Sequence, residues 1–362
     1  MSATGRACGE SPRIAASAPG AEGGQVTAWL EVGDAGIGNS IQDAGRFGYR
    51  NMGITVSGWL DPLFARCANA LVGNPWGAAC IEVRGAGPSF TARDGRIRVA
   101  VVGDLPICHR RADGLESELP GWASVTLEPG DELEVGVVLG GVAYVAVGGG
   151  IATPVQLGSR STYERARIGG IGGRLIEAGD RLPCAAVADT DRHECAAAPW
   201  LHGGGPFRVI LGPQLGHFLP EAVQLFLGTE FEVTPQRDRM GMRLAGSQLT
   251  HLTPQAADIV SDGVAPGAIQ VPGNGQPIIL LADCQTVGGY PKIATVIAAD
   301  LPRLAQLKVG HKLRFRAVDA KTAKAALVER EARWRAWCGS VRGRVVSDPA
   351  DEDDLDACCA PI

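Results

Sequence analysis

The chain has few of the features that mark membrane, secreted or nucleic-acid-binding proteins. Aromatic residues make up 5% of its 362 residues, and no apolar run is long enough to cross a bilayer. The formal net charge is -5, so there is no basic excess for nucleic-acid phosphates. Residues 1–25 hold no apolar stretch of signal-peptide length. These absences favour a soluble cytoplasmic protein with no nucleic-acid or membrane partner.

The ten cysteines do not indicate a disulfide framework, because the chain is large and is expected in a reducing compartment. His193 and Cys195, and also Cys358 and Cys359, lack the spacing of zinc ligands. Cys67 and Cys80 lie in apolar sequence and are expected to behave as small hydrophobic residues. We therefore expect reduced thiols and no metal site.

Glycine is abundant, at 50 residues, which is about twice the usual share. Together with the scarce aromatics, this favours many short strands and tight turns: a mainly β fold with short helices (α+β). One short pattern recurs at Glu128–Leu133, Glu177–Leu182 and Lys308–Leu313, where a glycine and two polar residues precede a leucine. We interpret it as one tight turn that is reused in two related β lobes.

The chain divides into five expected parts. They are a disordered tail (1–26), a first β lobe (27–200), a second β lobe (201–318), a C-terminal helix (319–345) and an acidic disordered tail (346–362). The irregular stretch 189–205 is interpreted as a linker. The clearest helix is predicted to start after Asp61, which can cap its free amides, with Pro62 in the first turn. Shorter helices are predicted over 221–227 and from Asp300.

A turn with several kinds of polar side chain spans residues 283–292, between two short apolar runs that are typical of buried strands. Its polar side chains are Asp283, Gln285, Thr286, Tyr290 and Lys292. Folding alone rarely needs so many kinds of polar group in one turn, and sites tend to lie on loops held by a rigid scaffold. The alternatives are a hairpin with solvated side chains and a plain Asp283–Lys292 salt bridge.

Three other glycine-punctuated segments add candidate site residues. The first holds Arg46 and Ser57, the second holds Ser159, Arg160 and Arg174, and the third holds Asp238, Arg239 and Arg243. The third segment is interpreted either as a clamp for a carboxylate or as an internal ion-pair network. Glycines at 169–173 resemble a phosphate loop, but no helix can follow them, which favours a structural turn. Ser159 lacks the context of a hydrolase nucleophile.

These segments together resemble one family of carboxyltransferase subdomains. The resemblance rests on Q-D-A-G-R-F-G-Y at 42–49, G-G-G-I-A-T-P at 148–154, L-G-S-R-S-T at 157–162, D-R-M-G-M-R-L at 238–244, I-Q-V-P at 269–272 and Q-T-V-G-G-Y-P-K-I-A at 285–294. The family includes allophanate hydrolase subunit 2, the C component of the ATP-dependent 5-oxoprolinase and the C-terminal part of the urea carboxylase carboxyltransferase region. Cys284 is a departure from the family pattern, because members of the family commonly have an arginine at this position.

The resemblance implies two cyclophilin-like β-barrel lobes and a site that is completed by a sister subunit, the B component, which is similar to allophanate hydrolase subunit 1. A third, lactam-utilisation subunit is a further expected partner. The implied activity is the opening of 5-oxoproline, a small cyclic amide, to glutamate with ATP consumed by the complex. This chain shows no nucleotide motif of its own. The alternatives are a biotin-dependent carboxyltransferase, with biotin on another polypeptide, and a regulatory protein that binds its sister subunit.

Two sets of site residues follow. The expected catalytic residues, which would handle protons or stabilise developing charge, are Asp283, Gln285, Thr286, Tyr290, Lys292 and Asp238. The expected substrate- or anion-binding residues are Arg46, Ser57, Ser159, Arg160, Arg174, Arg239, Arg243 and Gln270.

Overall fold

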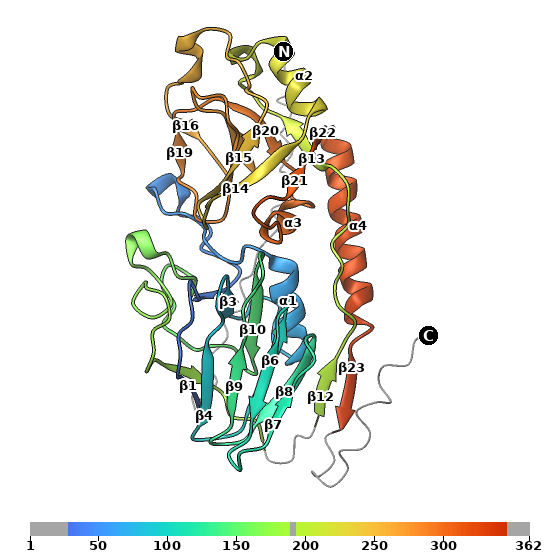
Figure 1. Ribbon diagram of the computed structural model, residues 1–362. Coiled ribbons are helices and arrows are strands. Elements are labelled where there is room, and N and C mark those ends of the chain that lie inside the picture. Colours follow the sequence, from blue (N-terminus) through green and yellow to red (C-terminus); the bar gives the residue numbers. More distant parts are fainter. Residues whose placement is uncertain (1–27, 189–192, 346–362) are drawn as a thin grey trace, which may run out of the picture.

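The computed structural model describes residues 28–188 and 193–345. They form two β lobes, one above the other in Figure 1, with a long C-terminal helix running beside both. The mainly β class with short helices is confirmed. The tails expected at 1–26 and 346–362 lie outside the described residues.

The first lobe is built from two antiparallel sheets that face each other. The first sheet contains, in spatial order, β11 (Arg181–Cys184), β1 (Ala28–Val32), β4 (Ser89–Arg93), β9 (Glu132–Val135), β6 (Ile107–Arg110) and β7 (Glu116–Glu118). The second contains β2 (Ser40–Gln42), β3 (Cys80–Val83), β10 (Ala143–Val147), β5 (Ile97–Val102), β8 (Ala123–Leu127), β12 (His193–Ala196) and β23 (Arg342–Val345). Alternate residues of β1 and β4 point inward, so Leu30 and Phe90 join Ile81 and Val99 in the core between the sheets.

Helix α1 (Pro62–Leu71) covers the other face of the second sheet. Asp61 caps it as predicted, because its carboxylate accepts hydrogen bonds from the amides of Leu63 and Phe64. The apolar face of this helix, which includes Leu63 and Leu71, is buried. This helix places Asp61 at the end of the first lobe that faces the second.

The second lobe is one nearly closed sheet. Its eight strands are, in order, β21 (Lys312–Leu313), β14 (Phe231–Arg237), β15 (Gly241–Gly246), β18 (Ile278–Leu280), β17 (Ala268–Gln270), β20 (Lys292–Val296), β13 (Phe207–Leu211) and β22 (Phe315–Ala317). The edge strands β21 and β22 are separated in sequence only by Arg314, so the two edges of the sheet come together there. Helix α2 (Pro220–Gly228) adds Phe226 to the core, stacked on Phe315 at 4.5 Å between ring centroids.

The smaller elements connect these sheets. They are α3 (Leu301–Ala305), the 3-10 turns η1 (Arg50–Met52), η2 (Glu164–Ala166), η3 (Leu215–His217) and η4 (Pro254–Ala257), and a two-stranded ribbon of β16 (Asp262–Gly263) and β19 (Val287–Gly288).

The recurring turn predicted from sequence is confirmed at all three positions. In each copy the backbone amide of the fourth residue donates a hydrogen bond to the backbone carbonyl of the first residue. The three bonds run from Asp131 to Glu128, from Asp180 to Glu177 and from His311 to Lys308. The glycine between them has a positive φ of 95°, 85° or 83°, which a residue with a side chain rarely adopts. Strands β9, β11 and β21 follow directly.

The C-terminal segment differs from the expected helix over 319–345. Helix α4 spans Ala320–Cys338, and residues 342–345 instead form β23, which pairs with β12. The expected linker therefore contains a strand, β12, that lies between β8 and the edge strand β23 in the first lobe's second sheet. Helix α4 contacts both lobes: Glu331 pairs with Arg66 of α1 at 3.0 Å, and Arg330 donates to the carbonyl of Ala298.

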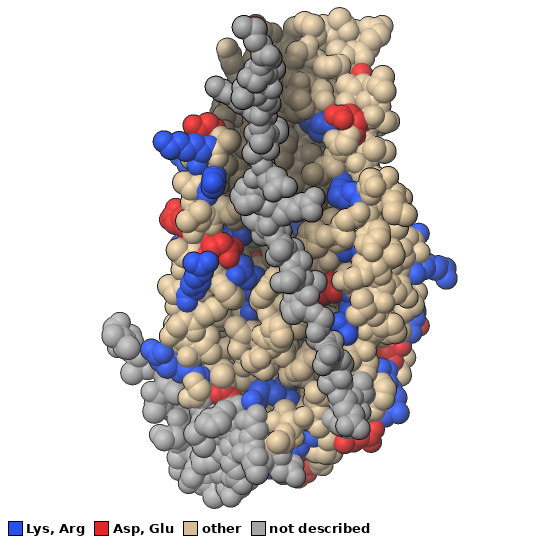
Figure 2. Space-filling model, turned by 180° about the vertical axis from the view of Figure 1, so that it is seen from behind, with Lys and Arg blue, Asp and Glu red and all other residues tan. Residues whose placement is uncertain are grey.

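Among the described residues, no helix is long and apolar enough to pass through a bilayer. On the face seen in Figure 2, acidic and basic side chains are interspersed over the visible surface. That face therefore shows no broad patch of a single sign.

Candidate functional site

The polar turn at 283–292 is not a hairpin turn. The strands before and after it, β18 and β20, are separated in the sheet by β17. The chain instead leaves the barrel after Leu281 and forms β19, which pairs with β16 outside the sheet. The amide of Val264 donates to the carbonyl of Thr286 at 3.1 Å, which fixes this excursion. The simple hairpin interpretation is therefore wrong.

This excursion forms one wall of a groove of about 440 Å³ on the second lobe. The other walls come from β14, β15, β17 and β18. Five of the expected site residues line it: Asp238, Arg243, Gln270, Gln285 and Tyr290. The sequence segments that supply them are far apart along the chain, and the barrel brings them together.

The groove presents amide, phenol, guanidinium and carboxylate groups. Gln270 is 2% exposed, and its Nε2 donates to the carbonyl of Tyr290 at 3.3 Å. Gln285 donates to Oε1 of Gln270 at 3.4 Å, so the two amides form a chain that orients them. Arg243 and Asp238 are exposed at the surface of the groove. Such a hollow, with a few convergent polar groups, is suited to a small polar molecule that has both donors and acceptors.

Arg239 lies at the junction of the lobes rather than in the groove. Its Nε donates to Asp283 at 2.8 Å and its Nη2 to the carbonyl of Gly58 at 2.6 Å, while Nη1 pairs with Glu82 of β3. Burial alone would lower its pKa, but Asp283 and Glu82 more than offset this, and the pKa is raised. All three nitrogens are used internally, and the side chain is 6% exposed. Arg239 therefore joins the lobes, in line with the ion-pair interpretation of its segment.

The junction continues into the first lobe through shared carboxylates. Glu82 also accepts from the Tyr144 hydroxyl at 2.7 Å and from the amide of Leu60 at 2.8 Å. Burial, followed by the charge of Glu82, raises the pKa of Tyr144 well above its ordinary value. Asp61 accepts from His202 at 2.7 Å and from Gln306 of the second lobe at 2.8 Å. The two lobes are thus fastened by a buried polar network.

Lys292 and Asp283 do not form the salt bridge considered from sequence. Asp283 pairs with Arg239, and the Lys292 ammonium pairs with Asp262 at 2.6 Å and donates to the carbonyl of Gly263 at 3.0 Å. Lys292 lies opposite Gln270 in the β17–β20 register, so it is next to the groove. Its bonds hold the β16–β19 ribbon against the barrel.

The candidates of the first lobe gather around Asp43. Its carboxylate accepts from the hydroxyls of Ser159 and Ser161 at 2.6 Å each and from the amide of Arg160 at 2.5 Å. The Arg160 side chain donates to the carbonyl of Thr153 at 2.8 Å. These bonds organise the loop, and the Ser159 hydroxyl donates to a carboxylate rather than to a histidine base.

Arg46 and Ser57 are buried in the same cluster. The Arg46 side chain is fully buried and donates to the carbonyls of Gln156 and Ser161, and burial lowers its pKa. Ser57 has a positive φ of 54°, unusual for a residue with a side chain, and its hydroxyl has no partner among the described residues. Strain of this kind is common at functional sites.

Arg174 lies apart from both groups. It makes a two-pronged pair with Asp180, with both distances 2.7 Å. The adjacent glycines do not form a phosphate loop, because the amides of Gly169, Gly170 and Gly173 all bond to internal acceptors. The structural-turn interpretation of this segment is therefore supported, and this segment does not fit a bound nucleotide phosphate.

Sequence reasoning missed several residues that build the site. Glu82 is a charged residue within an apolar strand, and that interruption was the available signal. Arg50 of η1 crosses from the first lobe to donate to the carbonyls of Val264 and, at 3.3 Å, Gln285. It lies against the buried Cys284, and no spacing in the sequence indicated that contact.

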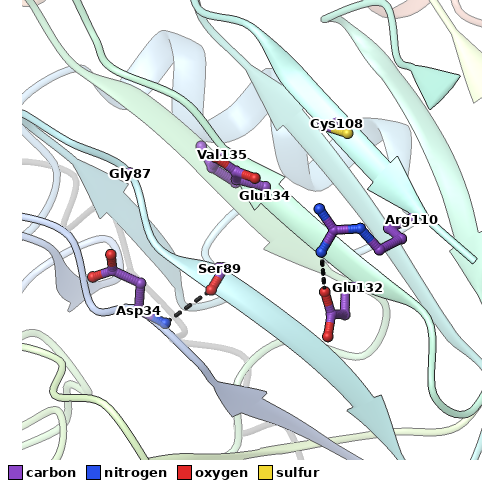
Figure 3. A pocket seen from close by; sticks show the side chains of 8 residues that line it. All are labelled: Asp34, Gly87, Ser89, Cys108, Arg110, Glu132, Glu134 and Val135. Carbon is purple, nitrogen blue, oxygen red and sulfur yellow. Dashed lines mark hydrogen bonds and ion pairs between the residues drawn. The ribbon is translucent and has the colours of Figure 1, made fainter. Parts of the chain in front are cut away.

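A second hollow, of about 270 Å³, lies on the outer face of the first lobe's first sheet (Figure 3). It contains none of the expected residues. Arg110 pairs there with Glu132 at 2.7 Å, and the amide of Asp34 donates to Ser89 at 2.8 Å. The described residues contain no group of three or more His, Cys, Asp or Glu side chains that could hold a metal ion. We favour the groove of the second lobe as the candidate site.

Comparison with known proteins identifies the family of this two-lobed β protein. The chain belongs to the family described as carboxyltransferase domain, subdomain A and B, whose model matches residues 52–317.

Individual relatives make the comparison more specific. The chain is 36% identical over 288 residues to the C component of the 5-oxoprolinase of Escherichia coli K12, covering 79% of this chain and 90% of that protein. It is 35% identical over 299 residues to the protein of the same name from Haemophilus influenzae, covering 81% and 93%. The crystal structure of the Kluyveromyces lactis urea amidolyase superposes with a TM-score of 0.75 at 25% identity, over 90% of this chain. This chain spans only 20% of that longer protein.

Proposed function

We propose that the protein is the C component of an ATP-dependent 5-oxoprolinase, which opens the lactam of 5-oxoproline to give glutamate. The observation that carries the proposal is the 36% identity across 90% of the E. coli protein of that name. The groove of the second lobe supports it, because its groups suit a small molecule with an amide and a carboxylate. The protein would work with sister subunits, since its relatives are named as single components of a larger enzyme.

The chemistry of the groove is compatible with this reaction. An amide carbon is a poor electrophile, and phosphorylation of the amide oxygen by ATP would supply a leaving group. The site then needs donors and cations for the charge that develops. In our proposal Gln270, Gln285 and Tyr290 orient the lactam, and Arg243 binds the substrate carboxylate. Asp238 lies at the groove surface, where it can accept a proton.

The other expected residues take supporting roles in this proposal. Lys292, Thr286 and Asp283 hold the loop that carries Gln285 and Tyr290. ATP would bind on a sister subunit or at a shared interface, since the glycine turn of this chain has its amides occupied. The cytoplasmic location stays a prediction.

A biotin-dependent carboxyltransferase is the second candidate, favoured by the similarity to the urea amidolyase structure. Biotin would then arrive on another polypeptide. The identity to that protein is 25%, against 36% for the E. coli 5-oxoprolinase component, so we place this candidate second. A purely regulatory role, in which the chain binds its sister without turnover, is the third.

Reconstitution separates these candidates. The chain would be co-expressed with its sister subunits, and the purified complex assayed for glutamate release from 5-oxoproline with and without ATP. The same complex would be assayed for carboxylation of urea with a biotinylated carrier. Glutamate release that depends on ATP supports the proposal. Urea carboxylation alone would favour the second candidate, and a tight complex that catalyses neither reaction would favour regulation.

A further inference from the structure

The groove wall that carries Gln285 is held from the first lobe, although the groove itself belongs to the second. After the chain leaves the barrel, the carbonyl of Ala282 accepts a hydrogen bond from the Thr55 hydroxyl at 3.0 Å. The carbonyl of Gln285 accepts one from Arg50 at 3.3 Å. Both donors lie on one short segment of the first lobe, so that segment holds the two ends of the stretch 282–285.

Arg50 bridges two parts of the second lobe. Its Nη2 donates to the carbonyl of Val264 as well as to that of Gln285. Val264 directly follows β16, and its own amide donates to the carbonyl of Thr286, so this contact lies at the end of the β16–β19 ribbon. In Figure 1 the segment that contains η1, in blue, lies beside β19. Arg50 therefore ties the ribbon and the Gln285 backbone to the first lobe.

The turn that presents Arg50 is closed by its own backbone. In η1 the amide of Met52 donates to the carbonyl of Tyr49 at 3.0 Å, and the amide of Gly53 donates to the carbonyl of Arg50 at 3.1 Å. Gly53 ends the turn with a positive φ of 81°, which a glycine adopts without strain. The guanidinium is thus presented from a fixed turn and not from a loose loop.

Within its own lobe, the Gln285 side chain is held weakly. Its bond to Gln270 is 3.4 Å long, whereas most N–H···O bonds are shorter. The residue before it, Cys284, is fully buried and lies against Arg50. The backbone from which the Gln285 amide enters the groove is therefore set by contacts with Arg50.

We propose that Arg50 is a positioning residue of the groove, through which the first lobe holds the Gln285 backbone and aims the Gln285 amide at the ligand. Arg50 is not one of the residues that line the groove, so its effect on a reaction there passes through Gln285. The expected effect on turnover rests on the function proposed above. The expected effect on the order of the loop does not.

A double-mutant cycle in the reconstituted complex tests the effect on turnover. Arg50→Met should lower kcat/KM for ATP-dependent glutamate release about tenfold, since small misplacements of a reacting group are costly. In a Gln285→Ala background the same change should cost less than about twofold, because the group that Arg50 positions is already absent. Equal falls in the two backgrounds would overturn the proposal, since Arg50 would then not act through Gln285.

Hydrogen exchange on the full chain tests the position of the loop without turnover. The amides of residues 282–288 should exchange faster in Arg50→Met than in wild type. The matched control is Arg66→Met, which removes a first-lobe arginine that pairs with Glu331 of α4 instead, and it should leave exchange of this stretch unchanged. Unchanged exchange in Arg50→Met, or equal increases in the two variants, would overturn the proposal.

The two measurements keep the positioning role and the proposed function apart. If the wild-type complex releases no glutamate, the proposed function fails and the exchange measurement alone decides the role of Arg50. Arg50→Lys keeps the charge and a donor but lacks the planar fork, so both effects should be smaller than in Arg50→Met. If Arg50→Met does not fold, Arg50→Lys takes its place in both measurements, with the same outcomes deciding.

Discussion

Replacing Arg239 by methionine is the sharpest test of how the lobes are joined. Methionine keeps the apolar stem but removes the guanidinium that contacts Glu82, Asp283 and the carbonyl of Gly58. Two carboxylates are then left in a junction where Glu82 is fully buried and Asp283 is 8% exposed. Removing one partner of a buried ion pair typically costs about 3–5 kcal/mol, since the remaining charge is uncompensated. We expect a loss of that size.

The assay is urea-induced unfolding followed by tryptophan fluorescence. Arg314→Met is the matched control, because Arg314 is 59% exposed and pairs with Glu230 at 3.2 Å. Its expected cost is about 1 kcal/mol or less, as for exposed ion pairs.

A combined variant separates the lost pair from the stranded carboxylates. Adding Glu82→Gln and Asp283→Asn to Arg239→Met removes both uncompensated charges, so we expect part of the stability to return. A loss below about 1 kcal/mol for Arg239→Met, or no recovery in the combined variant, would refute the idea that this network fastens the lobes.

Three further outcomes are expected. Burial alone would raise the pKa of Asp180, but hydrogen bonds from Arg174 and the Glu177 amide lower it. The stabilisation that Asp180 gives the folded protein is therefore present above its pKa in the unfolded chain, about 3.9, and is lost as the pH falls through its lower pKa in the folded protein. Asp180→Asn should thus flatten the acid limb of a stability–pH curve, and an unchanged limb would contradict this. Burial raises the pKa of Cys184 to about 12, so mass spectrometry should find it unlabelled by a thiol reagent in the folded protein, and rapid labelling would be inconsistent with its burial. Lys292→Ala should lower turnover of the complex while the chain stays folded by circular dichroism, because the ribbon loses its bonds to the barrel; unchanged turnover would contradict this supporting role of Lys292.

Much of the fold followed from local sequence. The cap at Asp61 and the three repeated turns are short-range features, set by residues within a few positions of each other. Strands β12 and β23 were missed because they are stabilised mainly by pairing with each other, although they are far apart in the sequence. Pairing between distant segments leaves no periodic signal in either one.

The sequence predicted the polar segments of the candidate site, but not which side chains form ion pairs with one another. The polar turn and the Arg243 segment stood out by composition, and the barrel brings them to one groove. Which carboxylate each cation contacts depends on the three-dimensional path of the chain. Asp283 therefore forms an ion pair with Arg239 rather than with Lys292, and Arg50 of the first lobe donates a hydrogen bond to the carbonyl of Gln285.

The claim that the groove is the reaction site is tested most directly by Gln285→Ala in the reconstituted complex. The matched control is Gln255→Ala, an exposed amide on η4 outside the groove. We predict that ATP-dependent glutamate release falls about a hundredfold in Gln285→Ala, the usual cost of losing one donor to a transition state, and stays at the wild-type rate in Gln255→Ala. Equal rates in the two variants would contradict the account.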